Sequence, residues 1–89
     1  LSVKDLLGQA FHPLRRAATE SILMSQALAR VYGRLYAAGG EHVREIVTDH
    51  AQRLHAGLKS ADLMADDIES VLEYMPHELR NALCEQEAS

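Results

Sequence analysis

The sequence predicts an all-α fold: an antiparallel hairpin of two long helices, with short terminal helical segments, that dimerises into a four-helix bundle. Three observations lead to this expectation. Helix formers dominate the 89 residues, and the alternation of apolar and polar residues that marks a strand is absent. Two adjacent glycines, Gly39 and Gly40, separate two long runs. Apolar residues in both runs recur at alternating steps of four and three, which is the heptad spacing of packed helices.

The first arm of the hairpin is expected over residues 1–38. Ser2 and Asp5 resemble a capping box, which places the start of a helix near Val3. Pro13 is expected to introduce a kink or a break. The heptad positions keep their phase across this proline; they are Val3, Leu7, Ala10, Leu14, Ala17, Ser21, Met24, Leu28, Val31 and Leu35.

Residues 39–40 are expected to form the turn, because glycine readily adopts the left-handed backbone conformation that ends many helices. The second arm is expected over residues 41–75, and residues 76–89 are expected to form a short helical tail, since Pro76 marks a helix end. The heptad positions of the second arm are Val43, Val47, His50, Leu54, Gly57, Ala61, Met64, Ile68, Val71 and Met75.

Folding the chain back at the glycines matches the two heptad seams layer by layer. Leu28 meets His50, and Ser21 meets Gly57, so that large residues face each other near the turn and small residues face each other in the middle. Oppositely charged side chains also come together; the expected pairs are Arg30 with Asp49, Arg34 with Glu45, Glu20 with Lys59, and Arg15 and Arg16 with Asp62, Asp66 and Asp67.

Beside the seam, both arms carry a second apolar row on the same side of the hairpin. We expect this row to be the dimer or partner interface; its residues are Ala18, Ile22, Ala29, Tyr32, Tyr36, Ala51, Leu58, Ala65 and Leu72. A soluble monomer rarely exposes an apolar face of this length to solvent. We favour self-association through a twofold axis. Docking of a different protein, and coverage of the face by residues 1–12 and 77–86, stay open as alternatives.

Composition argues against several classes of function. The net charge of −4 has the wrong sign for a typical nucleic-acid module, although residues 1–36 carry a balance of +3 and residues 62–89 one of −7. We expect no membrane span, because no run of 18 apolar residues occurs, and no signal peptide at the N-terminus. The single cysteine, Cys84, fits a reducing cytoplasm.

The spacing of reactive residues predicts a protein without enzymatic activity, metal or cofactor. His50 and His55 are five residues apart, which places them about 140° apart around a helix. The spacings that zinc and di-iron sites favour do not occur, and the glycines do not fit a phosphate-binding loop. We expect His50 to be a core residue whose protonation would place a charge in a packed layer. No nucleophilic role is expected for Cys84.

Three stretches of the sequence have a pattern that is found in a known family; they are ILMSQALARVYGRLY (residues 22–36), GGEHVREI (residues 39–46) and SVLEYMP (residues 70–76). Together they resemble the TraM-type antiactivators of bacterial quorum sensing, which are small helical proteins that bind and inactivate LuxR-type transcription factors. The resemblance implies two long antiparallel helices that dimerise. It also implies that the partner is an acyl-homoserine-lactone-responsive activator, which is sequestered so that it cannot dimerise or bind DNA.

We therefore expect a cytoplasmic bacterial regulatory module that sequesters a LuxR-type transcription activator. Two alternatives stay open. One is a secretion chaperone or structural coiled-coil subunit that uses the same apolar face. The other is a small nucleic-acid-binding hairpin dimer, which is supported by the arginines of the first arm, Arg15, Arg16, Arg30 and Arg34.

Overall fold

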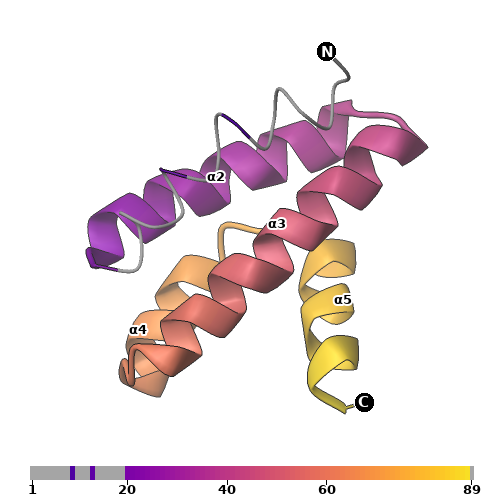
Figure 1. Ribbon diagram of the computed structural model, residues 1–89. Coiled ribbons are helices and arrows are strands. Elements are labelled where there is room, and N and C mark those ends of the chain that lie inside the picture. The colour runs from indigo at the N-terminus through magenta and orange to yellow at the C-terminus, as the bar shows by residue number, and fades with distance from the viewer. Residues whose placement is uncertain (1–8, 10–12, 14–19, 89) are drawn as a thin grey trace.

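Four α-helices make up the part of the chain that the computed structural model describes, which comprises residues 9, 13 and 20–88 (Figure 1). They are α2 (Ile22–Ala38), α3 (Glu41–Ser60), α4 (Ala65–Leu72) and α5 (His77–Ala88). No strand occurs among these residues, which confirms the all-α expectation. None of the four helices is both long and apolar enough to cross a bilayer. The residues on either side of Pro13, where a kink or break is expected, and Ala18 of the expected interface lie outside the described residues.

Helix α2 begins after Ser21, whose extended backbone (φ −148°, ψ 122°) is not helical. The Ser21 hydroxyl accepts a hydrogen bond from the backbone N–H of Met24 at 3.4 Å, which is the N-cap arrangement. The first arm expected over residues 1–38 is therefore interrupted at Ser21. Serine is common both at the N-cap of a helix and as a small residue between packed helices. The heptad spacing therefore did not show which of these two roles Ser21 has.

Gly39 and Gly40 join α2 to α3 with extended backbone, and the expected left-handed conformation is wrong. Their φ angles are −86° and −78°, and no glycine in the described residues has a positive φ. A Cβ built on Gly39 would lie 2.7 Å from the backbone oxygen of Leu35 and 2.6 Å from Cγ1 of Val43. A Cβ on Gly40 would have no atom within 4 Å. Position 39 therefore requires glycine, because a side chain would collide with Leu35 and Val43, whereas position 40 has room for a side chain.

The chain reverses direction after α3, so the single second arm expected over residues 41–75 is wrong. Asp62 adopts a φ of 59°, in the left-handed region, and its N–H donates to the carbonyl of Lys59 at 3.1 Å. Aspartate is one of the few residues with a side chain that tolerate this conformation. Helix α4 then starts with Asp66 and Asp67 in its first turn, where negative charge is favourable.

Helices α4 and α5 return to the two longer helices, α4 packing against α2 and α5 against α3 (Figure 1). Helix α5 follows Pro76, within the segment expected to form a short helical tail. The apolar core lies between these helices and draws on all four; its buried residues are Leu28, Ala29, Tyr32, Val47, Ala51, Leu54, Leu58, Val71, Met75, Leu79 and Leu83. The C-terminal part of the chain thus completes the core of the N-terminal part.

The heptad seam of α2 differs from the buried side of this helix. Two seam residues, Met24 and Val31, are 41% and 42% exposed. Ala29 and Tyr32, which were expected beside the seam, are fully buried. Helix α2 is therefore turned about its axis relative to the expected register, because α4 and α5 add partners that a two-helix hairpin lacks.

Gly39→Ser and Gly40→Ser are expected to change the free energy of unfolding in opposite directions. At position 40 the serine side chain enters open space and can cap α3, which has no side-chain cap, so we expect a gain of about 0.5–1 kcal/mol. At position 39 the same side chain meets the Leu35 carbonyl, and we expect a loss of about 1–3 kcal/mol. Urea unfolding followed by circular dichroism measures both values. Effects of equal sign and size would show that crowding at Gly39 does not shape the turn.

Candidate functional site

Of the nine residues expected to form an open apolar face, eight lie among the described residues, and seven of these are buried or half-buried. Four of them are completely buried; these are Ala29, Tyr32, Ala51 and Leu58. Three are half-buried, namely Ile22, Tyr36 and Leu72, and Ala65 is exposed. Because the reversal at Asp62 brings α4 and α5 back over this face, the chain covers it by itself. The four buried residues therefore cannot line a docking surface of this structure.

The exposed apolar surface lies instead on the opposite side of α2. We call it the α2 outer face and define it by Leu23, Met24, Ala27 and Val31, all of which are exposed. Leu23 is 78% exposed, the largest value among the large apolar residues that the structure describes. Steps of three and four residues place these side chains on one stripe of the helix. They form a continuous apolar row rather than isolated exposed residues.

A shallow groove runs along the α2 outer face. It measures about 160 Å³ and is lined by Met24, Ala27, Leu28 and Val31. Arg30 and Arg34 are exposed on the same side of the helix. A surface of this kind receives an apolar side chain of another helix and attracts negative charge to its margin.

Sequence reasoning placed Met24 and Val31 in the buried seam and left Leu23 unassigned. A signal for the α2 outer face was nevertheless present, because Leu23, Ala27 and Val31 follow each other at steps of four. Helix α2 is apolar on two sides, and periodicity alone does not indicate which side the rest of the chain covers.

Arg30 has a different partner from the one expected. Its Nη2 donates to the hydroxyl of Tyr74 at 3.0 Å, and its guanidinium lies 4.3 Å from the centre of the same ring. Asp49, the expected partner of Arg30, pairs with Arg53 on its own helix at 3.3 Å. The segment between α4 and α5 therefore holds Arg30 at the margin of the α2 outer face.

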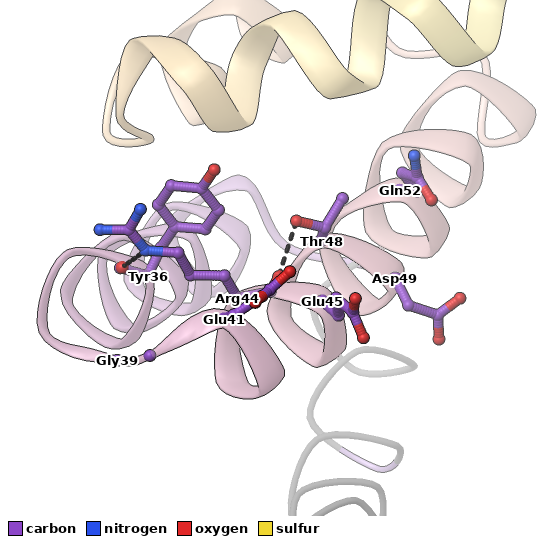
Figure 2. Close-up of a pocket in the computed structure, with 9 residues that line it drawn as sticks. Tyr36, Gly39, Glu41, Arg44, Glu45, Thr48, Asp49 and Gln52 are labelled. Carbon is purple, nitrogen blue, oxygen red and sulfur yellow. Dashed lines mark hydrogen bonds between the residues drawn. The ribbon is translucent and has the colours of Figure 1, made fainter.

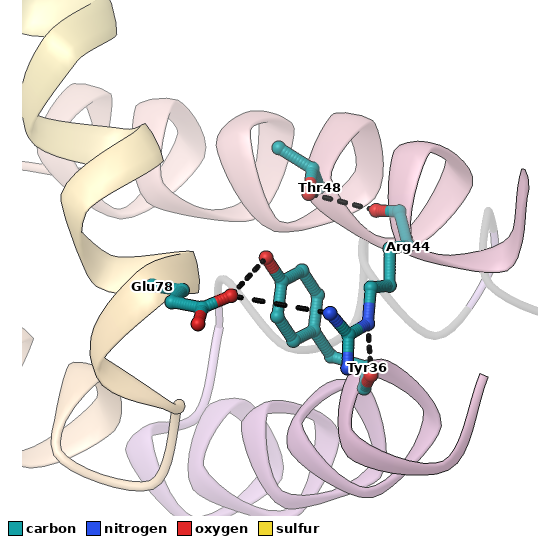
Figure 3. A network of polar contacts seen from close by, with 4 residues as sticks. All are labelled: Tyr36, Arg44, Thr48 and Glu78. Carbon is teal, nitrogen blue, oxygen red and sulfur yellow. Dashed lines mark hydrogen bonds and ion pairs between the residues drawn. The ribbon is translucent and has the colours of Figure 1, made fainter. Parts of the chain in front are cut away.

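A polar cluster joins α2, α3 and α5 (Figure 3). The Nε of Arg44 donates to the backbone carbonyl of Tyr36 at 2.9 Å, and the guanidinium lies 4.9 Å from the centre of the Tyr36 ring. Glu78, in the first turn of α5, lies 4.0 Å from Nη1 of Arg44 and accepts a hydrogen bond from the Tyr36 hydroxyl at 3.4 Å. Thr48 donates to the carbonyl of Arg44 at 2.7 Å. These contacts fix the end of α2 to the start of α5.

An open cavity of about 610 Å³ lies beside this cluster, along the first half of α3 (Figure 2). Most of the residues that line it have polar side chains; the lining consists of Tyr36, Gly39, Gly40, Glu41, Arg44, Glu45, Thr48, Asp49 and Gln52. The guanidinium of Arg44 is engaged by Tyr36 and Glu78, and Glu41 and Glu45 are exposed to solvent. The cavity is therefore a solvated hollow next to a structural cluster.

The residue types that ligate metals or act as nucleophiles are dispersed. Within the described residues, no group of three or more His, Cys, Asp or Glu side chains is placed to hold a metal ion. His50 and His55 are buried on α3, and the His50 ring lies 6.5 Å from the Tyr32 ring. His50 is thus a core residue, as its seam position predicts. Cys84 is an exposed free cysteine.

Comparison with known proteins does not assign the chain to a family. No protein-family model matches the chain, and no curated protein or solved structure shows significant similarity to it. The resemblance to TraM-type antiactivators therefore stays a prediction from the sequence.

Arg44→Ala is expected to lower the free energy of unfolding by about 1 kcal/mol, because it removes the hydrogen bond to the end of α2 and the stacking on Tyr36 together. Arg53→Ala is the matched control, since it breaks an exposed pair within one helix, and it is expected to cost less than about 0.5 kcal/mol. Thermal unfolding monitored at 222 nm compares the two variants. Equal losses would argue against the polar cluster as a joint between three helices.

Proposed function

We propose that this chain is a non-enzymatic protein-binding module whose docking surface is the α2 outer face. The observation that carries the proposal is the exposed row of Leu23, Met24, Ala27 and Val31 beside an apolar groove. A large apolar side chain contributes about 1.5–3 kcal/mol when it passes from water into a packed interface. A row of such side chains on one helix therefore gains free energy by contact with another protein.

The α2 outer face suits an amphipathic helix as its partner. A groove between side chains on a helix receives residues that recur at steps of three and four on the facing helix. Arg30 and Arg34 favour acidic residues beside that apolar stripe. Because Arg30 is already held by Tyr74, it loses less side-chain entropy when it pairs with such a residue.

The resemblance to TraM-type antiactivators includes residues 22–36, which form most of α2. This supports a LuxR-type transcription activator as the partner. In this proposal the module sequesters the activator in a bacterial cytoplasm and thereby keeps it from dimerising or binding DNA. The module itself contacts neither nucleic acid nor a cofactor.

A transcription reporter tests this proposal. The chain is co-expressed with a LuxR-type activator from the same genome in the presence of the activator's acyl-homoserine lactone, and we expect transcription from the target promoter to fall. Leu23→Asp is expected to raise the Kd for the activator about tenfold or more, because it places a charge in an apolar contact, so most of the repression is lost.

Ala56→Asp is the matched control, because it adds the same charge at an exposed position of α3. It is expected to repress as well as the wild type, and circular dichroism of both variants is expected to match the wild-type spectrum. Full repression by Leu23→Asp would contradict the α2 outer face as the docking surface. A wild-type chain that leaves transcription unchanged would contradict a LuxR-type activator as the partner.

A further inference from the structure

We propose that the cavity between α2 and the connection from α4 to α5 binds a small molecule through its phosphate group. We call this cavity the arginine pocket. It measures about 390 Å³ and shares no residue with the α2 outer face, so the inference goes beyond the proposed function and does not depend on it. The pocket is lined by Arg30, Gly33, Arg34, Ala37, Tyr74 and Pro76.

The close approach of the connection to α2 forms the pocket. A Cβ on Gly33 would lie 2.8 Å from the backbone oxygen of Tyr74 and 3.4 Å from Cδ of Pro76, so the connection lies this near to α2 because position 33 is glycine. Arg30 and Arg34 are four residues apart, which places them one turn apart on the same side of the helix. Both arginines therefore reach one cavity from a single helix.

The guanidinium of Arg30 is already held in position. Its Nη2 donates to the Tyr74 hydroxyl at 3.0 Å, and its central carbon lies 4.3 Å from the centre of the Tyr74 ring. Neither contact neutralises the charge of Arg30. The Tyr74 hydroxyl accepts this hydrogen bond, so its own O–H is available to donate to a ligand. A guanidinium that is ordered in advance loses less side-chain entropy when an anion binds.

The arginine pocket is a positive site in a chain whose net charge is −4. None of the described residues that line it is acidic. The nearby acids Glu69 on α4 and Glu78 on α5 pair with other arginines, and no carboxylate of the described residues pairs with Arg30 or Arg34. The two positive charges are therefore available to a ligand.

The polar groups of the pocket match a phosphate monoester better than a carboxylate. Two guanidiniums and a phenol O–H are all donors, so the group that binds them has to accept several hydrogen bonds. A phosphate monoester has three terminal oxygens and a charge of about −1.5 to −2 at neutral pH, which balances two arginines. A carboxylate has two oxygens and one charge, which suit a single guanidinium.

The size of the pocket indicates a small molecule rather than a free phosphate ion. Cavities that bind small molecules measure about 300–1,000 Å³, and the arginine pocket falls within this range. Ala37 and Pro76 give it an apolar side that a phosphate ion alone would leave uncovered. An organic group attached to the phosphate can cover this side.

A bound phosphate would also act on the proposed docking surface, because Arg30 and Arg34 lie at the margin of the α2 outer face. It neutralises the two charges that favour acidic residues of a partner, so the ligand is expected to weaken binding of that partner. This consequence rests on the proposed function, whereas binding of the ligand does not.

Titration of the whole chain with phenyl phosphate tests the inference. At constant ionic strength we expect a Kd of about 0.1–1 mM by isothermal calorimetry, and we expect the backbone amide resonances of Gly33 and Ala37 to shift in NMR spectra. Benzoate has the same ring and a single charge, and it is expected to bind about tenfold more weakly. Inorganic phosphate lacks the ring and is also expected to bind more weakly.

Two variants and a matched control locate the binding site. Arg34→Gln removes one of the two charges and is expected to raise the Kd for phenyl phosphate about tenfold. Tyr74→Phe keeps the ring against Arg30 and removes the hydroxyl, so we expect a smaller increase of about threefold. Arg53→Gln removes the same charge from an exposed arginine of α3 and is expected to leave the Kd unchanged.

Three results would overturn the inference. They are a Kd for phenyl phosphate above about 10 mM, equal affinity for phenyl phosphate and either benzoate or inorganic phosphate, and an equal loss of affinity in Arg34→Gln and Arg53→Gln. The titration contains no partner protein, so its result is independent of the transcription reporter. Phosphate binding without repression would contradict the proposed function alone, and repression without phosphate binding would contradict this inference alone.

Discussion

The fold depends on the reversal of the chain at Asp62. A left-handed backbone costs a residue with a side chain roughly 1–2 kcal/mol, and the hydrogen bond from the Asp62 N–H to Lys59 offsets only part of this. The larger gain comes from the segment that returns. Val71, Leu79 and Leu83 are at most 1% exposed, and burial of each contributes about 1.5–3 kcal/mol. The apolar residues beyond the reversal therefore outweigh its cost, and they also cover the face that a simple hairpin would leave in water.

Close contact between α2 and the returning segment is a second constraint. A Cβ on Gly33 would lie 2.8 Å from the backbone oxygen of Tyr74, so a larger residue would displace the connection between α4 and α5. The same connection brings the Tyr74 ring against the guanidinium of Arg30. At the C-terminal end of α2, Arg44 makes a comparable contact with Tyr36. The middle and the C-terminal end of α2 are thus tied to the other helices, and among the described residues the outer side of α2 is the exposed one.

Local sequence features predicted the helical segments, whereas the neighbours of each helix were not predictable from them. The glycine pair and Pro76 mark element ends through their own backbone chemistry, which acts within a few residues. The heptad steps continue through Met64 across the reversal, and such steps carry no information about the direction of the chain. The candidate site was missed for the same reason: whether Val31 or Tyr32 faces the core depends on α4 and α5, which pack there only through long-range contacts.

The two long helices differ in what their outer sides offer to another molecule. Helix α3 presents exposed charged residues such as Asp49 and Arg53, which pair with each other and are well hydrated. Helix α2 presents Leu23, Ala27 and Val31 instead. A helix with apolar stripes on opposite sides is typical of the interior of an assembly, because each stripe gains free energy only when something covers it. In the proposed function, α2 is a middle layer, with its own chain on one side and a helix of the partner on the other. We therefore base the functional hypothesis on α2. The cavity along α3 is larger, but covering its charged residues would gain less free energy.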